Sequence, residues 1–233
     1  MDKKPILFLL HGALGAAEQF DAWKPILEPH FSLIIPELEG HGKTPQPTER
    51  PFRIENFAEN ISAAIRQTGE EKVNIFGYSM GGYAALELAA TRPKSIHKIF
   101  TLATKFDWNP DGAAKEVRML DAGRIKEKIP AFAQTLSQRH TAIGWENHLA
   151  KTAEMMLHLG FSPTLTHEKL RQIPLPIRLS LGDRDTMVTL QETSDVFKIL
   201  QNGELQVFPA TSHPLEKVKP EKLLPSLLEF FKN

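Results

Sequence analysis

The sequence predicts an α/β fold in which a mostly parallel sheet of about six strands is flanked by helices and carries an inserted helical cap. Three observations lead to this prediction. Short apolar runs alternate with helix-like segments in the first and last parts of the chain. Between residues 104 and 173 the alternation stops, and helical patterns broken by proline and glycine replace it. We therefore expect residues 1–103 and 174–233 to form the core, with the cap (104–173) inserted between the fourth and fifth core strands.

The first predicted strand, Ile6–Leu10, is a continuous apolar run rather than an alternating one. Such runs are typical of strands that are buried on both faces of a parallel sheet. The six predicted strands are Ile6–Leu10, Phe31–Ile35, Val73–Phe76, Ile96–Leu102, Ile177–Leu181 and Leu205–Phe208. Right-handed crossovers through the intervening helices would make these strands parallel. The loops at their carboxyl ends then share one rim, which is where ligands bind to such sheets.

Helices are expected between the strands, and proline or glycine predicts where they end. Apolar residues at intervals of three and four from Ile54 onward predict an amphipathic helix that Gly69 ends. An alanine-rich segment after Ser79 predicts a helix that stops near Arg92, because a proline follows. The other core helices are expected at Phe20–Leu27, Val188–Leu200 and Leu215–Phe231.

Composition excludes several classes of partner. Lys and Arg together number 28, as do Asp and Glu, so no global field attracts nucleic acid or an anionic membrane. No run approaches the roughly 18 apolar residues of a membrane span, and Ile6–Leu10 is too short for the core of a signal peptide. The absence of cysteine excludes disulfides and thiolate nucleophiles. We expect a cytoplasmic protein with a small-molecule substrate, and the sequence leaves its oligomeric state open.

One motif organises the predicted chemistry, the G-x-S-x-G sequence Gly77-Tyr78-Ser79-Met80-Gly81. It lies between an apolar strand and an alanine-rich helix, which is the context that this motif requires. In such a nucleophile elbow the serine occupies a strained turn, and glycines flank it because side chains there would collide with neighbouring backbone. We therefore predict Ser79 as a nucleophile.

A serine nucleophile needs a base, and the base needs an acid that fixes its tautomer. On an elbow scaffold the acid follows the serine in the chain and the histidine comes last. His213 is the one histidine after the last predicted strand, so it is the predicted base. The loop that ends the fifth strand offers two carboxylates, of which we favour Asp185 and interpret Asp183 as a surface or loop-capping residue. Asp107, after the fourth strand, is the reserve candidate.

The developing oxyanion needs two preorganised N–H donors. On this scaffold one is the backbone N–H of the residue after the nucleophile, and the other lies in the loop after the first apolar strand. These positions are Met80 and Ala13. Both donors belong to the main chain, so substituting either side chain would leave them in place.

Five motifs in this order resemble those of the capped α/β-hydrolases, a family that includes carboxylesterases, lipases, thioesterases and small carbon–carbon-bond hydrolases. The resemblance extends over nearly the whole chain and implies that His11 and His41 are structural or pocket-edge residues. Two departures from the family pattern, Glu37-Leu38-Glu39 and Ser212, concern the pocket mouth rather than the triad. The matching motifs are His11-Gly12, Pro36–Gly42, Gly77–Gly81, Gly182–Asp185 and His213.

Substrate choice is expected to depend on an apolar pocket beneath the cap. Its predicted lining residues are His11, Tyr78, Trp108, Trp145 and Met156. Most other large apolar cap residues are expected to pack within the cap, because helical spacing alone does not distinguish a pocket wall from a core. The cap histidines lack the close spacing of helical metal ligands, so we predict neither a metal nor a cofactor; they are at positions 140, 148, 158 and 167.

The sequence thus predicts a serine hydrolase that cleaves a carboxylic ester or thioester of a small, largely apolar acyl compound. Ser79, His213 and Asp185 would form its triad, and an acyl-enzyme would be the intermediate. The same triad also serves carbon–carbon bond hydrolysis, elimination and perhydrolysis, which remain alternatives. Dehalogenases and epoxide hydrolases of this fold need a carboxylate at position 79 and are disfavoured. A non-catalytic ligand receptor is the last alternative, and the complete set of three residues argues against it.

Overall fold

Six parallel strands form one sheet among the residues that the computed structural model describes, 3–47 and 49–232. Their order across the sheet is β2-β1-β3-β4-β5-β6, which confirms the predicted fold class. In the register of the central strands, Leu9 of β1 lies beside Phe76 of β3, and Phe76 lies beside Phe100 of β4. The strands are β1 (Ile6–Leu10), β2 (Ser32–Ile34), β3 (Val73–Tyr78), β4 (Ile96–Leu102), β5 (Ile177–Gly182) and β6 (Gly203–Phe208).

The strand order creates a crevice beyond the carboxyl ends of the strands, between β1 and β3. From β1 the chain runs outward to β2 and then returns to form β3 on the other side of β1. The connections that follow β1 and β3 therefore leave the sheet in opposite directions, which opens a crevice beyond their carboxyl ends. The loop that begins at His11 and the turn at Ser79 lie at this point.

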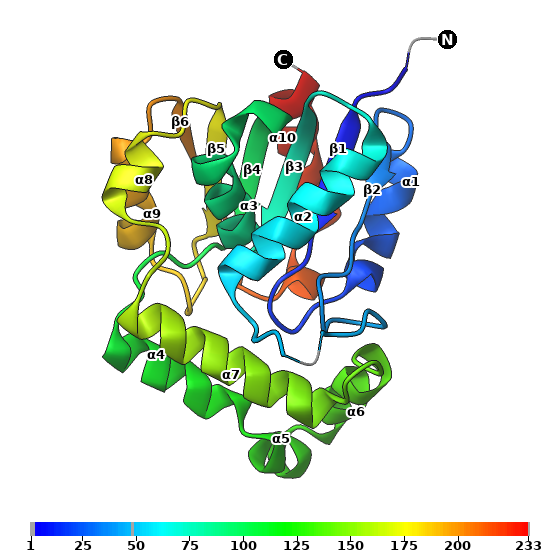
Figure 1. The fold of residues 1–233 in the computed structure, drawn as a ribbon, viewed down its shortest axis with the longest axis vertical. Helices are drawn as coiled ribbons and strands as arrows, with labels where there is room; N and C mark the ends of the chain where they lie inside the picture. Colours follow the sequence, from blue (N-terminus) through cyan, green and yellow to red (C-terminus); the bar gives the residue numbers. More distant parts are fainter. Residues whose placement is uncertain (1–2, 48, 233) are drawn as a thin grey trace.

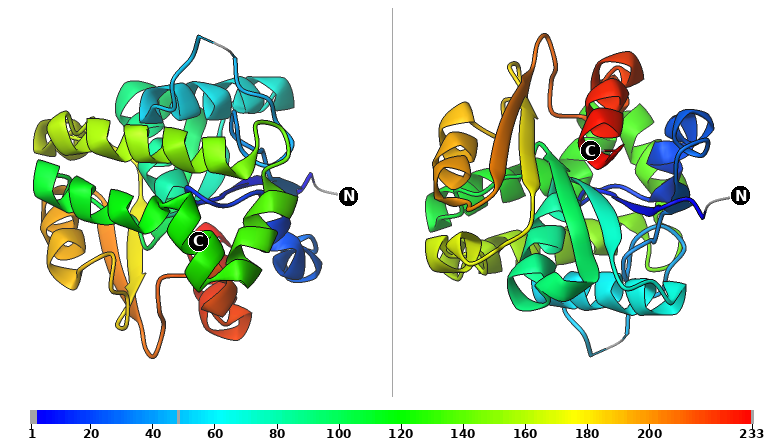
Figure 2. Two further views of the ribbon diagram at one scale, coloured as in Figure 1. Left: turned by 90° about the horizontal axis from the view of Figure 1, so that it is seen from below. Right: turned by 90° about the horizontal axis from the view of Figure 1, so that it is seen from above.

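Helices cover both faces of the sheet (Figures 1 and 2). The apolar sides of α2, α3 and α9 pack on one face, and those of η1, α1 and α10 pack on the other. The 3₁₀ helices of the core are η1 (Ala17–Trp23), η2 (Pro93–Ser95) and η4 (Leu215–Lys217). The α-helices of these two layers are α1 (Lys24–Leu27), α2 (Ile54–Thr68), α3 (Met80–Thr91), α9 (Leu190–Ile199) and α10 (Pro220–Lys232).

Local sequence explains most of these boundaries. Helix α2 ends at Gly69, which adopts a left-handed φ of 70°, as predicted. The single helix expected at Phe20–Leu27 is instead a 3₁₀ helix followed by one turn of α-helix, because Pro25 at the start of α1 supplies no N–H to a helix that continues from η1. Helix α9 begins with a capping box, in which the side chain of Thr189 accepts a hydrogen bond from the N–H of Glu192.

A separate layer of helices lies across the carboxyl ends of the strands (Figure 1). We call α4, α5, α6 and α7 the helical layer; its own apolar cluster includes Ile125, Leu136 and Trp145. Helix α8 (His167–Arg171) packs against α3 and α9 instead, although the sequence analysis grouped it with the cap. The layer consists of α4 (Pro110–Val117), η3 (Arg118–Leu120), α5 (Ala122–Lys128), α6 (Pro130–Arg139) and α7 (Trp145–Phe161).

None of the helices in the described part of the chain is both long enough and apolar enough to cross a membrane.

Candidate active site

Ser79 occupies a strained turn between β3 and α3. Its φ of 51° and ψ of −115° are conformations that a residue with a Cβ rarely adopts. The flanking glycines permit this turn: a Cβ on Gly77 would lie 2.5 Å from the Cα of Gly82, and one on Gly81 would lie 2.6 Å from the carbonyl oxygen of His11. The N–H of Ser79 donates to the carbonyl of Leu102 at 2.8 Å, which ties the turn to β4. The turn therefore has the geometry predicted for a nucleophile elbow.

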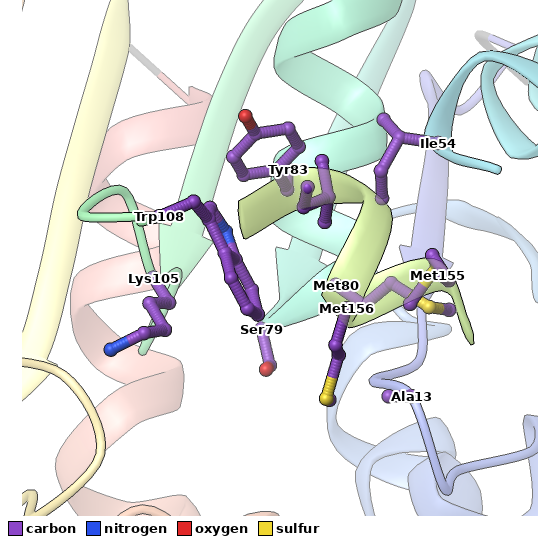
Figure 3. Close-up of a pocket in the computed structure, with 10 residues that line it drawn as sticks. Ala13, Ile54, Ser79, Met80, Tyr83, Lys105, Trp108, Met155 and Met156 are labelled. Carbon is purple, nitrogen blue, oxygen red and sulfur yellow. The ribbon is translucent and has the colours of Figure 1, made fainter. Parts of the chain in front are cut away.

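Ser79 lines two adjoining cavities, a narrow one of about 40 Å³ and a wide one of about 250 Å³. Ala13 and Met156 line both of them as well. Figure 3 shows the narrow cavity, in which Trp108 and Lys105 lie on one side of Ser79 and Met80, Met156 and Ala13 on the other. Its remaining lining residues are Ile54, Tyr83, Met155 and Leu159, so its wall is mostly apolar.

His213 and Asp185 form a hydrogen-bonded pair at the wide cavity. Nδ1 of His213 lies 2.8 Å from Oδ2 of Asp185, and the Asp185 side chain is only 1% exposed. The other carboxylate oxygen of Asp185 accepts hydrogen bonds from the N–H groups of Met187 and Val188 at 2.8 and 2.9 Å. These two donors hold the carboxylate in place, so the imidazole is oriented by a fixed acceptor.

The structure distinguishes Asp185 from the two other candidate acids. Asp183 accepts a hydrogen bond from the N–H of Thr211 at 3.1 Å, and its backbone hydrogen bonds lower its pKa, as expected for a loop-capping carboxylate. Asp107 accepts a hydrogen bond from Asn109 and lines a different cavity. Of the three candidates, Asp185 is the one that contacts His213. The catalytic roles of the pair remain predictions.

Ala13 and Met80 are the two residues whose N–H groups were predicted to form the oxyanion hole. Ala13 lies in the turn after β1, and Met80 is the first residue of α3. The first N–H groups of a helix have no partner within the helix, and the helix dipole favours negative charge there. Both residues line the narrow cavity beside Ser79. Their N–H groups are candidates for binding an oxyanion.

Tyr78 connects the elbow to the loop that carries His213. Its hydroxyl donates a hydrogen bond to the backbone carbonyl of His213 at 3.0 Å. Burial raises the pKa of Tyr78, so this hydroxyl stays protonated and keeps its donor. The sequence analysis predicted Tyr78 as a pocket residue, and it does line the wide cavity. The tether to His213 was not predicted.

Two predicted pocket residues lie elsewhere. The His11 ring is completely buried, with Nε2 accepting a hydrogen bond from the N–H of Leu38 and Nδ1 facing the carbonyl of Gly12. Trp145 packs in the apolar cluster of the helical layer. Neither belongs to the lining of the two cavities at Ser79, which corrects the prediction for both. Trp108 and Met156 are found in the lining of the narrow cavity.

Four buried histidines form what we call the histidine cluster: His11, His41, His140 and His148. The rings of His140 and His148 stack with centroids 3.7 Å apart. Burial lowers the pKa of all four, to about 4 for His11 and about 3 for His140. Their nitrogens face backbone groups, and within the described residues no three His, Asp or Glu side chains converge as a metal site.

The wide cavity also has a polar end that the sequence analysis missed. Arg139 donates to Glu18 at 2.8 Å, and Gln19 donates to Glu216 at 2.7 Å. Of these residues, Gln19, Arg139 and Glu216 line the cavity. They come from η1, α6 and η4, so no local motif could have indicated that they meet.

Comparisons with known proteins identify the fold family of the chain. The model of the alpha/beta hydrolase fold family matches residues 5–152. The pimeloyl-[acyl-carrier protein] methyl ester esterase of Neisseria meningitidis serogroup C is 31% identical over 228 residues, which cover 89% of this chain and 86% of that protein. The protein of the same name from Pseudoalteromonas atlantica is 25% identical over 249 residues, covering 97% and 93%.

A solved structure extends the comparison to the fold. The 2-hydroxy-6-oxo-6-phenylhexa-2,4-dienoate hydrolase of Rhodococcus sp. strain RHA1 superposes with a TM-score of 0.81. The two sequences are 21% identical, and the superposition covers 99% of this chain and 91% of that one. At this identity the likeness concerns the fold alone.

Proposed function

Because the chain belongs to the alpha/beta hydrolase fold family, we propose that it hydrolyses carboxylic esters through Ser79, His213 and Asp185. One observation carries this proposal: His213 lines the same cavity as Ser79, and its Nδ1 lies 2.8 Å from Oδ2 of Asp185. The strained turn at Ser79 and the two N–H groups beside it supply the other parts of a serine hydrolase.

The proposed reaction has two steps. Nδ1–H of His213 donates to Asp185, which leaves Nε2 free to take the proton of Ser79 as its oxygen attacks the ester carbonyl. The N–H groups of Ala13 and Met80 bind the oxyanion that forms. The alkoxide leaves with the proton from His213, and a water molecule activated by the same nitrogen then hydrolyses the acyl-enzyme.

The narrow cavity supports a small, largely apolar acyl group, since methionine, leucine and tryptophan side chains line it. The two curated relatives named above are methyl ester esterases, which favours an ester over a thioester as the substrate. In this proposal residues 104–173 form a cap whose helical layer covers the acyl site. The cysteine-free composition supports a reducing compartment, and we propose the cytoplasm.

Labelling with a fluorophosphonate probe, followed by hydrolysis of p-nitrophenyl acetate and butyrate, tests the proposal. The parent should label and hydrolyse both esters. Ser79→Ala should not label, because the probe reacts only with an activated serine. Removing the nucleophile or the base should lower kcat by about 10⁶-fold, so Ser79→Ala and His213→Ala should be nearly equal in activity.

Ser162→Ala is the matched control, because Ser162 is exposed at the end of α7 and lies outside both cavities. This variant should label and hydrolyse like the parent. A folded parent that neither labels nor hydrolyses either ester would contradict the proposed mechanism. Labelling that persists in Ser79→Ala would assign the reactive serine to another position.

A further inference from the structure

The turn after β1 is held by side chains that come from the helical layer. The N–H of Gly15 donates to the carbonyl of Gly12 at 3.0 Å and closes a turn with Ala13 and Leu14 at its centre. The carbonyl of Leu14 accepts a hydrogen bond from Nη1 of Arg139 at 2.8 Å. The carbonyl of Ala13 faces Nε2 of His148 at 2.8 Å and Nε2 of His41 at 3.1 Å. His148 and Ala13 are 135 positions apart in the chain.

A carbonyl oxygen can only accept, so a ring nitrogen that bonds to it must carry hydrogen. Both nitrogens of His148 face carbonyl oxygens, Nδ1 that of Gly40 at 2.9 Å and Nε2 that of Ala13 at 2.8 Å. A neutral imidazole has one N–H and can serve only one of them. In the arrangement that we propose, the hydrogen is on Nε2, towards Ala13.

The His148 ring itself has little freedom to move. It is completely buried, it stacks on His140, and its edge meets His41 with centroids 4.5 Å apart. Burial lowers the pKa of His148, which keeps the ring neutral near pH 7. The bond to Ala13 is therefore a fixed contact between the helical layer and the core.

From this geometry we propose that His148 is a positioning residue for the oxyanion hole: its Nε2–H holds the carbonyl of Ala13 and so aims the N–H of the same residue at the reacting carbonyl. The inference rests on the proposed function, in which the N–H of Ala13 is an oxyanion donor. The N–H of Ala13 shares a peptide plane with the carbonyl of Gly12, which the N–H of Gly15 holds at 3.0 Å, and the carbonyl of Ala13 belongs to the next plane. Holding both carbonyls therefore restricts both torsions at Ala13 and, with them, the direction of its N–H. Catalysis then depends on how the helical layer docks.

Two amide substitutions test the roles of the two ring nitrogens of His148 separately. In His148→Gln the longer side chain can place an NH₂ group where Nε2 was, whereas in His148→Asn the amide reaches only the position of Nδ1. Misplacing a donor by about 1 Å costs on the order of 10²-fold, so kcat for p-nitrophenyl acetate should fall by about that factor in His148→Asn. KM should stay within about twofold, because the donor acts on the transition state. The expected kcat of His148→Gln is within about fivefold of the parent.

His158→Gln is the control for a histidine-to-amide change in the same helix, because His158 lies outside the cluster and both cavities. All variants are compared well below their melting temperatures. If His148→Asn does not fold, the ring ¹⁵N chemical shifts of His148 in the parent carry the test, because they report which nitrogen bears the hydrogen. Hydrogen on Nδ1 instead of Nε2 would overturn the inference.

The outcomes distinguish this inference from the proposed function. An active parent whose Gln and Asn variants have equal kcat would overturn the inference alone. Variants that melt at lower temperature but keep the parental kcat would also overturn it, because a purely structural role predicts that result. A folded parent that neither labels nor hydrolyses ester overturns the proposed function and this inference with it.

Discussion

His213 and the histidine cluster show how the partners of an imidazole ring decide what it can do. His213 faces a buried carboxylate at 2.8 Å and lines an open cavity. The rings of the cluster face backbone carbonyl and N–H groups and each other, and burial lowers their pKa values. Burial opposes positive charge on the rings of the cluster. One residue type is therefore suited to proton transfer at one site and to fixed hydrogen bonding at the other.

The two sites also meet the same stretch of backbone from opposite sides. Ala13 lies in the lining of the wide cavity together with His213. On its other side, the carbonyl of Ala13 contacts His41 and His148. The proposed base and the proposed positioning residue thus both lie near Ala13. The contrast predicts that substituting Asp185 lowers kcat, whereas acid lowers the free energy of unfolding through the histidine cluster.

The largest effect is expected from Asp185→Asn. The N–H groups of Met187 and Val188 would keep the amide oxygen, so the NH₂ group would face Nδ1 of His213. The ring would then carry its hydrogen on Nε2 and could not accept the proton of Ser79. We expect kcat for p-nitrophenyl acetate to fall by about 10⁴-fold, with the melting temperature little changed.

Asp183→Asn is the matched control from the same loop, since Asp183 bonds to the backbone of Thr211 rather than to His213. It should lower stability slightly and leave kcat within about twofold of the parent, because only a loop contact is weakened. Comparable losses of activity in the two variants would show that the loop as a whole, and not the carboxylate at 185, supports His213.

The second prediction concerns acid and the histidine cluster. The pKa of His11 is lowered to about 4, whereas it is about 6.5 in the unfolded chain, so the unfolded chain binds a proton first as pH falls. The stability that this group confers is present in full above pH 6.5 and is lost progressively between pH 6.5 and 4. For His11 alone, the free energy of unfolding should drop by roughly 2 kcal/mol between pH 7.5 and 5. Urea titrations at several pH values measure it.

The other cluster histidines act in the same direction, since burial lowers their pKa values too. His148→Gln should therefore flatten the pH dependence, because it removes one titrating ring. His97 is a partly exposed histidine outside the cluster whose pKa is also lowered, and His97→Gln should change the slope less. A free energy of unfolding that is constant from pH 7.5 to 5 would contradict the neutral, buried state of the cluster.

Local sequence patterns were sufficient to predict the sheet and the elbow. The apolar run of β1 is typical of a strand that is buried on both faces, and the close approach of backbone at Gly77 and Gly81 demands glycine. Both requirements act on residues that are adjacent in the chain. The six strands and the turn at Ser79 therefore follow directly from the sequence.

The contacts of the helical layer could not be predicted in the same way. Trp145 and His148 both lie in the first turn of α7. The His148 ring contacts the carbonyl of Ala13, whereas the Trp145 ring packs inside the helical layer. Helical spacing shows which residues share a face but not what that face meets. His11 was misassigned to the pocket for a related reason: its motif locates the loop, whereas the direction of its ring depends on Leu38, 27 positions away.

The smallest effect is expected from Tyr78→Phe, which tests whether His213 also needs a backbone tether. The change removes the hydroxyl that donates to the carbonyl of His213 at 3.0 Å and keeps the ring. One lost hydrogen bond corresponds to about 1 kcal/mol, so kcat should fall by about fivefold if the whole of that loss is felt in the transition state. Steady-state kinetics with p-nitrophenyl acetate measure it, and KM should change little.

Ser180→Ala is the appropriate control, because Ser180 is a buried hydroxyl that donates to the carbonyl of Thr101 at 2.6 Å, away from the cavities. Both variants should lower the free energy of unfolding by about 1 kcal/mol, but only Tyr78→Phe should lower kcat. Equal kcat values would mean that Asp185 alone orients His213. The imidazole of the proposed base would then depend on its carboxylate, while those of the cluster depend on backbone groups, and the contrast between the two sites would be sharper still.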